Sequence, residues 1–303
     1  MRTHPARVLT LLTALLLGAA RGSPAQEVPT RSADPYLGAI VIDGGNGDVL
    51  FEDHADAPGY PASVIKLMNL LIILEYNESG MVGFEDPVTV TAEASNMGGS
   101  QVYLKEKEVF TVDELVYAMI VQSANDAAVA LATSIAGTKD AFVETMNSHA
   151  QSLRMTATKF HSVHGLPPGP GQEPDVSTAR DLAYLCRELV KRPAALKYTS
   201  TQERGFRNDT FIMRTHNPLL ASFEGCDGLK TGYFTKAGFS IACTAERKGM
   251  RVIAVVLGSV DKNTRNTKAA ELMAKGFLEI ARRQAQEVNP APPPAAPTPA
   301  PAK

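Results

Sequence analysis

Ser63 and Lys66 are the residues whose types and spacing most suggest chemistry. They stand three residues apart in the run PASVIK, so on a helix their side chains lie on one face and can meet. The segment from Leu67 to Leu74 is almost wholly apolar and predicts a buried helix. Burial favours the neutral amine of a lysine, which can accept the proton of a serine. The same pattern also fits an N-capping serine followed by an incidental lysine, because S-x-x-K is frequent.

The expected position of Ser63 would favour a reactive serine. Pro61 suits the first turn of a helix, which puts Ser63 close to the helix N-terminus. Unpaired backbone N–H groups and the positive end of the helix dipole favour a developing negative charge there. The predicted chemistry is that of a serine nucleophile activated by a lysine base.

Two further polar motifs follow, Ser123-Ala124-Asn125 and Lys230-Thr231-Gly232. The first stands at the junction of two predicted helices, and the second lies in a predicted strand. Each is a weak signal by itself, because such short patterns arise by chance. The three motifs in this order are a much more specific signal than any one of them.

The elements that must position these motifs can be predicted from hydrophobic periodicity and turn residues. Thr111 to Glu114 has the form of a capping box, and Ser177 is a plausible cap for a later helix. In chain order we expect a hairpin over 36–51, helices from 62, 111, 126, 139 and 178, strands over 228–233, 238–246 and 251–257, and a closing helix over 268–284, with a short extended piece over 88–91.

This order predicts an α+β fold in which one antiparallel five-stranded sheet is assembled from both ends of the chain. Helices would flank the sheet, and the middle of the chain would form a helical subdomain. We find no internal repeat in the sequence.

Composition narrows the function classes. The chain has 303 residues, 44% of them hydrophobic, and a formal net charge of −2. Nucleic acid is an unexpected partner, because a net basic balance and a long basic run are both missing. No His, Cys or Glu cluster has the spacing of metal ligands, so we expect neither a metal nor another cofactor.

The two ends of the chain differ in character from the rest. Basic residues, an apolar run and small residues make 1–25 a predicted signal peptide, cleaved before Gln26, with Gly22 as an alternative. We expect a polar lead-in over 26–35, one catalytic domain over 36–284 and a disordered Pro/Ala-rich tail over 285–303. The protein would be secreted across the inner membrane and be periplasmic or cell-wall associated, without an amphipathic membrane anchor.

The motifs together resemble those of the low-molecular-mass penicillin-binding proteins of the D-alanyl-D-alanine carboxypeptidase family. The S-x-x-K, S-x-N and K-T-G order is shared, and the blocks Met97–Ser100, His164–Leu166 and Asp227–Tyr233 look like family blocks. The resemblance covers about 36–281. It implies a β-lactamase/transpeptidase-like fold, peptidoglycan stem peptides as substrate and β-lactam antibiotics as covalent inhibitors.

The resemblance also implies a role for each motif residue. Ser63 would attack the carbonyl between two terminal D-alanines, with Lys66 as general base. Ser123 would relay the proton to the leaving amine, and Asn125 would bind the substrate backbone and help to hold Lys66. For the strand motif, the implied substrate-binding residues are Lys230 and Thr231 at the terminal carboxylate, Gly232 making room at the strand edge, and Tyr233 supplying an oxyanion N–H with Ser63.

The expected roles of two histidines and two cysteines follow less directly from the motifs. His164 is expected to order a loop. His216 stands near where some family members carry arginine, so it is a hypothetical carboxylate ligand, and a substrate affinity that is flat between about pH 5 and 8 would remove that hypothesis. Cys226 and Cys243 are expected to be nearly opposite in a hairpin, with two reduced thiols as the default and a disulfide as the alternative.

Three other functions stay open. A D,D-endopeptidase would cut peptidoglycan cross-links with the same residues. A class A β-lactamase would need a deacylating carboxylate, but no E-x-x-L-N segment lies between Asn125 and Lys230. A non-catalytic β-lactam or muropeptide sensor could use the same fold.

Overall fold

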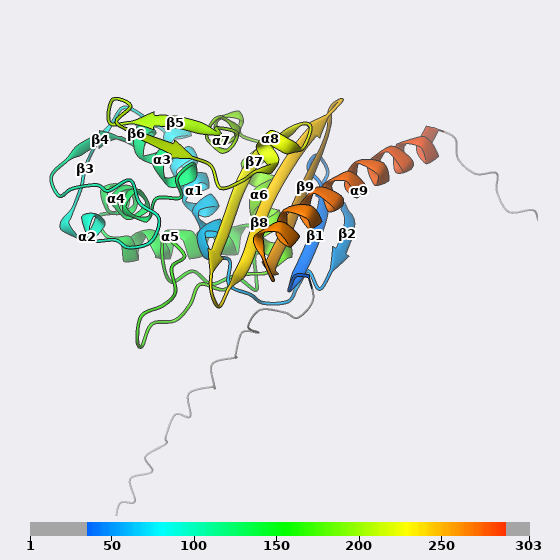
Figure 1. Cartoon of the computed structure of the whole chain (residues 1–303), viewed down its shortest axis with the longest axis horizontal. Helices are drawn as coiled ribbons and strands as arrows, with labels where there is room; N and C mark the ends of the chain where they lie inside the picture. The colour runs from blue at the N-terminus through cyan, green and yellow to red at the C-terminus, as the bar shows by residue number, and fades with distance from the viewer. Residues whose placement is uncertain (1–34, 289–303) are drawn as a thin grey trace, which may run out of the picture.

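The chain is built around one five-stranded antiparallel sheet, as the computed structural model of residues 35–288 shows (Figure 1). The strand order is β2-β1-β9-β8-β7, so the first two strands and the last three meet between β1 and β9, as predicted. The strands of this sheet are β1 Gly38–Asp43, β2 Val49–Asp53, β7 Cys226–Phe234, β8 Gly238–Arg247 and β9 Met250–Ser259.

Most helices lie between β2 and β7 in the sequence and form a helical region beside the sheet (Figure 1). A 3-10 turn, η1 Ala62–Ile65, leads into the first helix. The helices are α1 Lys66–Glu78, α2 Ala92–Ser95, α3 Val112–Ile120, α4 Asn125–Ala136, α5 Lys139–Ser152, α6 Ala179–Val190, α7 Pro193–Thr199, α8 Leu219–Ser222 and α9 Lys262–Val288.

The two faces of the sheet carry separate apolar cores, because side chains alternate along a strand. On β1, Ala39 and Val41 pack with Met273 and other residues of α9, on one face. Ile40 and Ile42 belong to the larger core that includes α1 and α6 on the other face. In Figure 1, α9 accordingly crosses in front of the sheet while α6 lies behind it.

The helix α1 runs through the middle of the larger core. Every side chain from Lys66 to Leu74 is buried, which confirms the prediction of a helix without a solvent face. The capping box at Thr111 and Glu114 is also confirmed, since each side chain accepts from the other residue's backbone N–H.

Several boundaries differ from the prediction. Thr178, and not Ser177, caps α6 by accepting from the Asp181 N–H, because the Ser177 hydroxyl bonds Thr158 instead. The closing helix begins at Lys262, six residues earlier than expected, because Asp261 accepts the N–H groups of its first turn. Two small two-stranded sheets were not predicted. They are β3 Pro87–Thr89 with β4 Val109–Thr111, and β5 Glu203–Phe206 with β6 Phe211–Arg214. Of these strands, only β3 falls in the predicted extended piece over 88–91.

The expected register of the two cysteines was wrong. Cys226 pairs with Ala245 and Cys243 pairs with Leu229, because Phe234 pairs with Gly238 and the turn is therefore centred on Lys236 rather than between Phe234 and Thr235. Both thiols are free, so the default of two reduced cysteines is confirmed and the disulfide alternative is wrong. Burial raises the pKa of the Cys226 thiol to about 11, which leaves it protonated at neutral pH.

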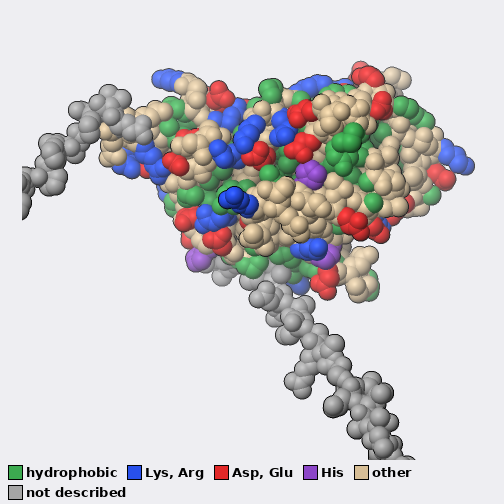
Figure 2. All heavy atoms as spheres, turned by 180° about the vertical axis from the view of Figure 1, so that it is seen from behind, with side chains coloured by type: hydrophobic (Ala, Val, Ile, Leu, Met, Phe, Trp, Pro, Cys, Tyr) green, Lys and Arg blue, Asp and Glu red, His purple; other side chains and the backbone are tan. Residues whose placement is uncertain are grey.

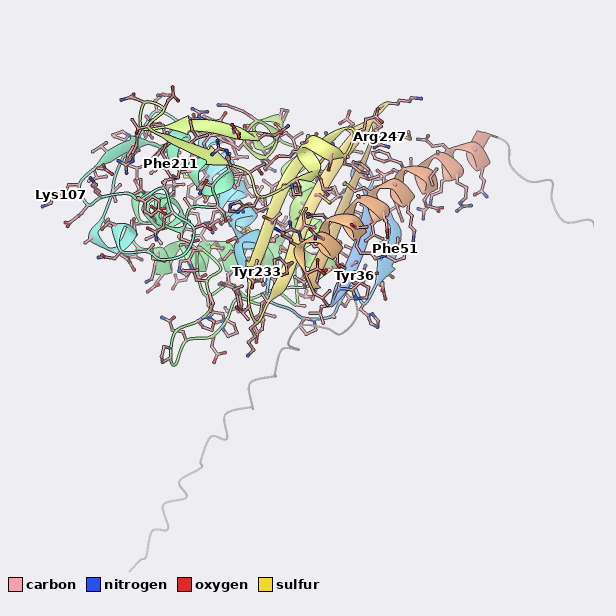
Figure 3. All side chains as sticks on the ribbon, in the orientation of Figure 1. Tyr36, Phe51, Lys107, Phe211, Tyr233 and Arg247 are labelled. Atoms are coloured by element: carbon pink, nitrogen blue, oxygen red, sulfur yellow. The ribbon has the colours of Figure 1, made fainter. Side chains whose placement is uncertain are left out.

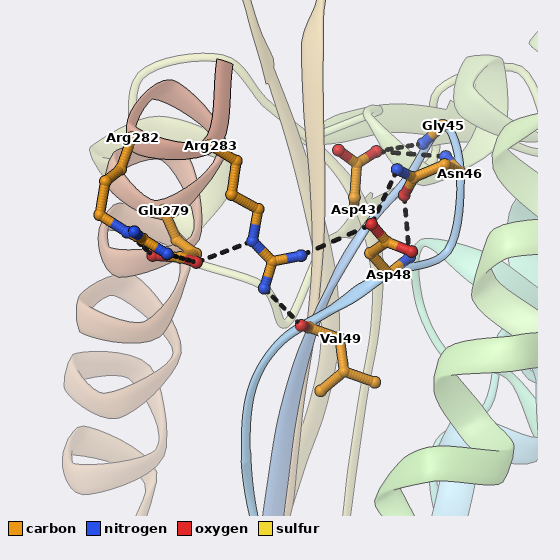
Figure 4. Close-up of polar contacts among 8 residues, drawn as sticks. All are labelled: Asp43, Gly45, Asn46, Asp48, Val49, Glu279, Arg282 and Arg283. Carbon is orange, nitrogen blue, oxygen red and sulfur yellow. Dashed lines mark hydrogen bonds and ion pairs between the residues drawn. The ribbon is translucent and has the colours of Figure 1, made fainter. Parts of the chain in front are cut away.

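Arg283 joins the far end of α9 to the β1–β2 hairpin (Figure 4). Its guanidinium donates to the Val49 carbonyl at 3.0 Å and to Glu279 at 2.7 Å, and it lies 3.5 Å from Asp48. The Val49 carbonyl belongs to edge strand β2, so this contact covers part of the sheet edge. The end of the helix is therefore fixed to the domain by polar contacts beyond its last buried residue, Ile280.

Residues 1–34 and 289–303, which include the predicted signal peptide and most of the predicted tail, lie outside the described residues. Within 35–288, no helix has the length and apolarity needed to span a membrane. On the face seen in Figure 2, acidic and basic side chains are interspersed, and no broad basic patch of the kind that binds nucleic acid is visible there.

Candidate active site

Lys66 is the centre of the site. Its side chain is fully buried at the first turn of α1, and its Nζ lies 3.0 Å from Ser63 Oγ, 2.7 Å from Asn125 Oδ1 and 2.9 Å from the His164 carbonyl oxygen. Two of these partners can only accept a hydrogen bond, while the hydroxyl can also donate one. A neutral amine has two N–H donors and one lone pair, so it fits this set of partners with Ser63 as the donor.

The electrostatics favour that neutral amine. Burial lowers the pKa of Lys66 well below its ordinary value, and the nearby charge of Lys230 lowers it further. The carboxylates of Asp126 and Asp175 act in the opposite direction and do not cancel the effect. The arrangement provides a base in contact with the serine hydroxyl.

Ser63 lies in η1, one turn before the α-helix proper. The prediction placed it at the N-terminus of an α-helix, and the structure differs in that the first turn is a 3-10 turn with Pro61 as the preceding cap. The spacing to Lys66 still brings the two side chains together, because the chain continues directly from η1 into α1. The hydroxyl of Ser63 is also 3.5 Å from the His164 carbonyl oxygen.

Asn125 connects Lys66 to the loop that carries Met97–Ser100. Its Oδ1 accepts from Lys66, its Nδ2 donates to the Gly98 carbonyl at 2.7 Å, and its backbone N–H donates to Ser100. One amide side chain therefore fixes both the lysine and one wall of the site.

Asp126 holds the same loop from the next position. Its buried carboxylate accepts from the backbone N–H groups of Val102 and Leu104. Two consecutive residues at the start of α4, Asn125 of the S-x-N motif and Asp126 after it, thus position the loop.

Ser123 stands just before α4 and is 3% exposed, with a left-handed φ of 62°. Within residues 35–288 its hydroxyl has no hydrogen-bond partner. The structure therefore brings Asn125 to Lys66 by direct contact but does not bond Ser123 to either Ser63 or Lys66.

The K-T-G motif lies on β7, the edge strand of the sheet that faces the helical region. A side chain at Gly232 would place its Cβ 2.4 Å from the Pro61 carbonyl oxygen and 3.1 Å from the Ser63 nitrogen. Only glycine lets the strand approach the turn that carries Ser63 this closely. The expected role of Gly232 in making room is thus supported by the packing.

Tyr233 follows on the same strand and is half exposed, with its ring stacked on Phe239 at 4.1 Å. Figure 3 shows it beside the helical region, away from Arg247 and Phe51. The stacking holds the backbone of Tyr233 at the strand edge beside Gly232.

A group of basic side chains gathers behind β7. Lys230 is 3% exposed and bonds only the Thr231 carbonyl oxygen. Burial and the charge of Arg265 lower the pKa of Lys230 to about 7, while Thr231 beside it is 6% exposed. Burial is the largest cause that lowers the pKa of His216 to about 4, and the charges of Lys230, Arg265 and Lys66 lower it further.

Arg265, on the first turn of α9, was not among the predicted site residues. It is buried, and its guanidinium donates only to the neighbouring Asn266 side chain. Buried guanidinium groups are normally paired with an acceptor anion, so among the described residues this group, with Lys230, lacks its expected partner. No sequence motif marks Arg265, which lies between the predicted last strand, ending at 257, and the predicted closing helix, beginning at 268.

The segment 161–165 also packs against the turn that carries Ser63. Asn69, one turn after Lys66 on α1, donates to the Val163 carbonyl at 2.8 Å, so Asn69 and Lys66 bind two consecutive carbonyl groups. Asn69 Oδ1 is buried without a hydrogen-bond partner in the described part of the chain. This residue was also missed, because an asparagine within an apolar helix has no motif.

His164 has the loop-ordering position that was expected. Its Nδ1 accepts from the Leu166 N–H at 3.1 Å, which places the ring proton on Nε2. Burial, with the charges of Lys66 and Lys139, lowers its pKa to about 4. No group of three His, Cys, Asp or Glu side chains within 35–288 could hold a metal ion.

Comparison with known proteins identifies the family. The family model described as D-alanyl-D-alanine carboxypeptidase matches residues 25–261. D-alanyl-D-alanine carboxypeptidase DacF of Bacillus subtilis is 34% identical over 244 residues, 80% of this chain and 62% of that protein. DacA of Escherichia coli is 34% identical over 257 residues, 82% of this chain and 62% of the relative. This chain therefore spans less than two thirds of the length of these relatives.

Solved structures agree with that result. Penicillin-binding protein 6B of Escherichia coli superposes with a TM-score of 0.75 at 31% identity, covering 84% of this chain and 81% of that chain. Penicillin-binding protein D2 of Listeria monocytogenes, in an ampicillin-bound form, superposes with a TM-score of 0.72 at 32% identity, covering 80% of this chain and 97% of that chain. The β-lactamase/transpeptidase-like α+β fold is thereby confirmed, and the chain belongs to the D-alanyl-D-alanine carboxypeptidase family of low-molecular-mass penicillin-binding proteins.

Proposed function

We propose that this protein is a serine-type D-Ala-D-Ala carboxypeptidase that removes the terminal D-alanine from peptidoglycan stem peptides. The observation that carries the proposal is the contact between Ser63 Oγ and the buried Lys66 amine at 3.0 Å, where burial lowers the lysine pKa. β-Lactam antibiotics would acylate the same serine, in keeping with the ampicillin-bound relative.

In the acylation step, Ser63 Oγ forms a bond to the carbonyl carbon between the two D-alanines while its proton passes to Lys66. The carbonyl oxygen becomes an oxyanion, for which the backbone N–H groups of Ser63 and Tyr233 are the candidate donors. The close approach of Gly232 to the Ser63 nitrogen supports this pairing.

Collapse of the intermediate breaks the C–N bond and releases D-alanine. The leaving nitrogen takes a proton through Ser123, whose unpaired hydroxyl is available for that relay. Water then attacks the acyl carbon and gives one proton to the Lys66 amine, which passes it to Ser63 Oγ as the ester C–O bond breaks and the shortened peptide leaves with a free carboxyl group.

The terminal carboxylate of the substrate would be bound by Thr231 and the basic group behind β7. Lys230 and Arg265 are buried cations without a carboxylate partner among the described residues, so an incoming carboxylate would supply the missing charge. His216, with a pKa of about 4, would contribute as a neutral donor.

The proposed location is outside the inner membrane, in the periplasm or at the cell wall, because peptidoglycan lies there. The predicted signal peptide over 1–25 supports export, and the family match begins at residue 25. The catalytic domain would extend from Pro35 to the end of α9 at Val288, and 289–303 would be a spacer.

The direct test is mass spectrometry of the purified protein with benzylpenicillin beside the Ser63→Ala variant, followed by release of alanine from a pentapeptide and from a cross-linked dimer. The expected result is an adduct that the variant lacks, together with release of alanine from the pentapeptide. Cleavage of the dimer alone would favour the endopeptidase, an adduct without turnover would favour a sensor, and no adduct would exclude Ser63 as the nucleophile.

A further inference from the structure

A cavity of about 300 Å³ lies between the start of α5 and the loop over 161–175 that leads toward α6. Its walls combine charged, histidine and apolar side chains. The residues that carry the argument are Lys139, Asp140, His161, His164, Leu166 and Glu173.

One wall of this cavity is shared with the catalytic site. His164 lines the cavity, while its carbonyl oxygen accepts from Lys66. Leu166 lines it as well, and a Cβ at Gly99 would lie 3.0 Å from the Leu166 side chain. The cavity is therefore one residue layer away from the nucleophile.

The cavity offers polar groups of both signs that remain available to a ligand. The side chains of Asp140, Glu173 and His161 form no hydrogen bond with any other residue of the described chain. Lys139 bonds Glu93 at 2.5 Å but has three N–H donors in all. His164 adds an Nε2–H donor, since its Nδ1 accepts from Leu166.

The expected path of the substrate peptide along β7 also leads toward this cavity. A peptide whose carboxylate lies at Lys230 and whose scissile carbonyl lies at Ser63 and Tyr233 runs along β7 and continues toward Phe234. Phe234 packs on Tyr60 at 5.7 Å, close in the chain to Gly59, which pairs with Ser177 just beyond the cavity loop. In Figure 1 that loop and the β7–β8 turn both lie at the lower side of the molecule.

We propose that this cavity receives the side chain of the third residue of the stem peptide and selects a diamino acid whose free end carries both an ammonium and a carboxylate group, as in meso-diaminopimelic acid. This inference rests on the function proposed above. Glu173 and Asp140 would bind the ammonium, and Lys139 and His161 the carboxylate. Leu166 would cover the methylene chain, and the third residue lies only about 3.4 Å further along an extended peptide than the acylated D-alanine.

The test compares alanine release from three pentapeptides that differ only in the third residue: meso-diaminopimelic acid, L-lysine and Nε-acetyl-L-lysine. These carry both charges, the ammonium alone and neither charge. We expect KM to be lowest for the diaminopimelic peptide and higher by about 10- to 100-fold for the acetylated one, the range for losing a charge-assisted hydrogen bond.

Two variants separate the charges. Glu173→Gln is expected to raise KM for both ammonium-bearing peptides toward that of the acetylated peptide. Lys139→Met is expected to raise KM for the diaminopimelic peptide alone. The matched controls are Glu144→Gln, an exposed position on α5 outside the cavity, and Glu93→Gln, which breaks the ion pair of Lys139 and keeps its ammonium.

Acylation by benzylpenicillin, measured on every variant, keeps the two proposals distinguishable, because that ligand has no diamino acid. A wild-type protein that is acylated and releases alanine equally from all three peptides would overturn the cavity proposal alone. Equal effects of Glu173→Gln and Glu144→Gln would overturn it too. A wild-type protein that is not acylated would overturn the proposed function and this inference with it.

Discussion

At the scale of single residues, the site depends on one amine whose surroundings disfavour its charge. Lys66 is buried beside Lys230, and its acceptors include the Asn125 and His164 oxygens. If those oxygens take the two N–H bonds of a neutral amine, its lone pair is left for the Ser63 hydroxyl, which lies 3.0 Å away. The same burial that is unfavourable for an ammonium thus favours a neutral amine beside the Ser63 hydroxyl, as the proposed function requires of a base.

The first prediction removes that base. Lys66→Met has a similar length and no nitrogen, so we expect acylation by benzylpenicillin to slow by about 10²- to 10⁴-fold, the usual contribution of a general base. Mass spectrometry over time measures the rate, and circular dichroism shows whether the variant is folded. A folded variant acylated within tenfold of the wild-type rate would mean that another group accepts the serine proton.

The second prediction concerns Lys230, whose pKa is lowered to about 7 by burial and by Arg265. Above this pH the ligand-free protein loses the lysine charge, so KM for a pentapeptide should rise by up to about tenfold per pH unit. Lys230→Arg keeps its charge and should remove the dependence. His216→Asn should leave it in place, because the pKa of His216 is about 4.

The same lowered pKa has a consequence for folding. Between about pH 7 and 10.5 the unfolded chain binds a proton at Lys230 that the folded protein has released. The free energy of unfolding should therefore rise with pH across this interval, and this contribution should be absent in Lys230→Met. Urea unfolding at pH 7 and pH 9 measures the difference, and a contribution that falls with pH would contradict the assigned pKa.

The sequence predicted those site residues that are close together along the chain. It missed the residues that reach the site only when distant elements pack together. Ser63 and Lys66 are three residues apart, so helix geometry alone brings them together. Arg265 lies among the six residues of α9 before the predicted start of that helix, and its effect on Lys230 arises only when α9 packs on the sheet that contains β7. In the sequence Asn69 is a single polar residue in an apolar helix, and its hydrogen bond to the Val163 carbonyl forms only in the folded protein.

At the scale of elements, the site depends on two segments that pack against the turn η1. One is β7, at Gly232, and the other is the segment 161–165, at Gly165. A Cβ at Gly165 would lie 2.2 Å from the Ala62 carbonyl oxygen. Both contacts join parts of the chain far apart in the sequence, which is why the hydrophobic pattern predicted the strands and helices but not these approaches.

The third prediction tests the second of these contacts with a matched pair of glycines. Gly165 and Gly171 both have a φ of 76°, but a Cβ at Gly171 meets nothing within 4 Å. Alanine at either position should cost about 1–2 kcal/mol through the left-handed conformation. Only Gly165→Ala should also displace the His164 carbonyl from Lys66 and slow acylation, and equal acylation rates of the two variants would contradict this.

The fourth prediction concerns the start of α3, where the local signal was sufficient. Thr111 Oγ1 accepts from the Glu114 N–H at 3.2 Å, and the Glu114 carboxylate accepts from the Thr111 N–H at 2.8 Å. Thr111→Ala should lower the free energy of unfolding by about 1 kcal/mol. Thr111→Ser keeps the hydroxyl and should retain most of that stability. Urea unfolding of both variants beside the wild-type protein measures the difference.

At the scale of the whole molecule, the predicted topology followed from the order of the elements. Two strands at one end of the sequence and three at the other were predicted to share one sheet, and the structure joins the two groups by pairing β1 with β9. The predicted domain boundaries of 36 and 284 need adjustment. Pro35 accepts from Ser259 at 2.6 Å, and α9 continues to Val288, so the folded unit extends over 35–288.

The last prediction is that residues 35–288 form the complete catalytic domain by themselves. The apolar contacts of α9 with the sheet end at Ile280 and its polar contacts include Arg283, so a fragment over 35–288 should melt within about 2 °C of the chain from Gln26 to Lys303 and be acylated at the same rate. A fragment ending at residue 270 would lose Met273, Phe277 and Ile280 from the second core, which removes several side chains worth about 2–5 kcal/mol each, and should not fold. If the fragment over 35–288 also melted well below the longer chain, the segments outside it would contribute to the fold, and the proposed division of the chain into a domain and two accessory ends would be wrong.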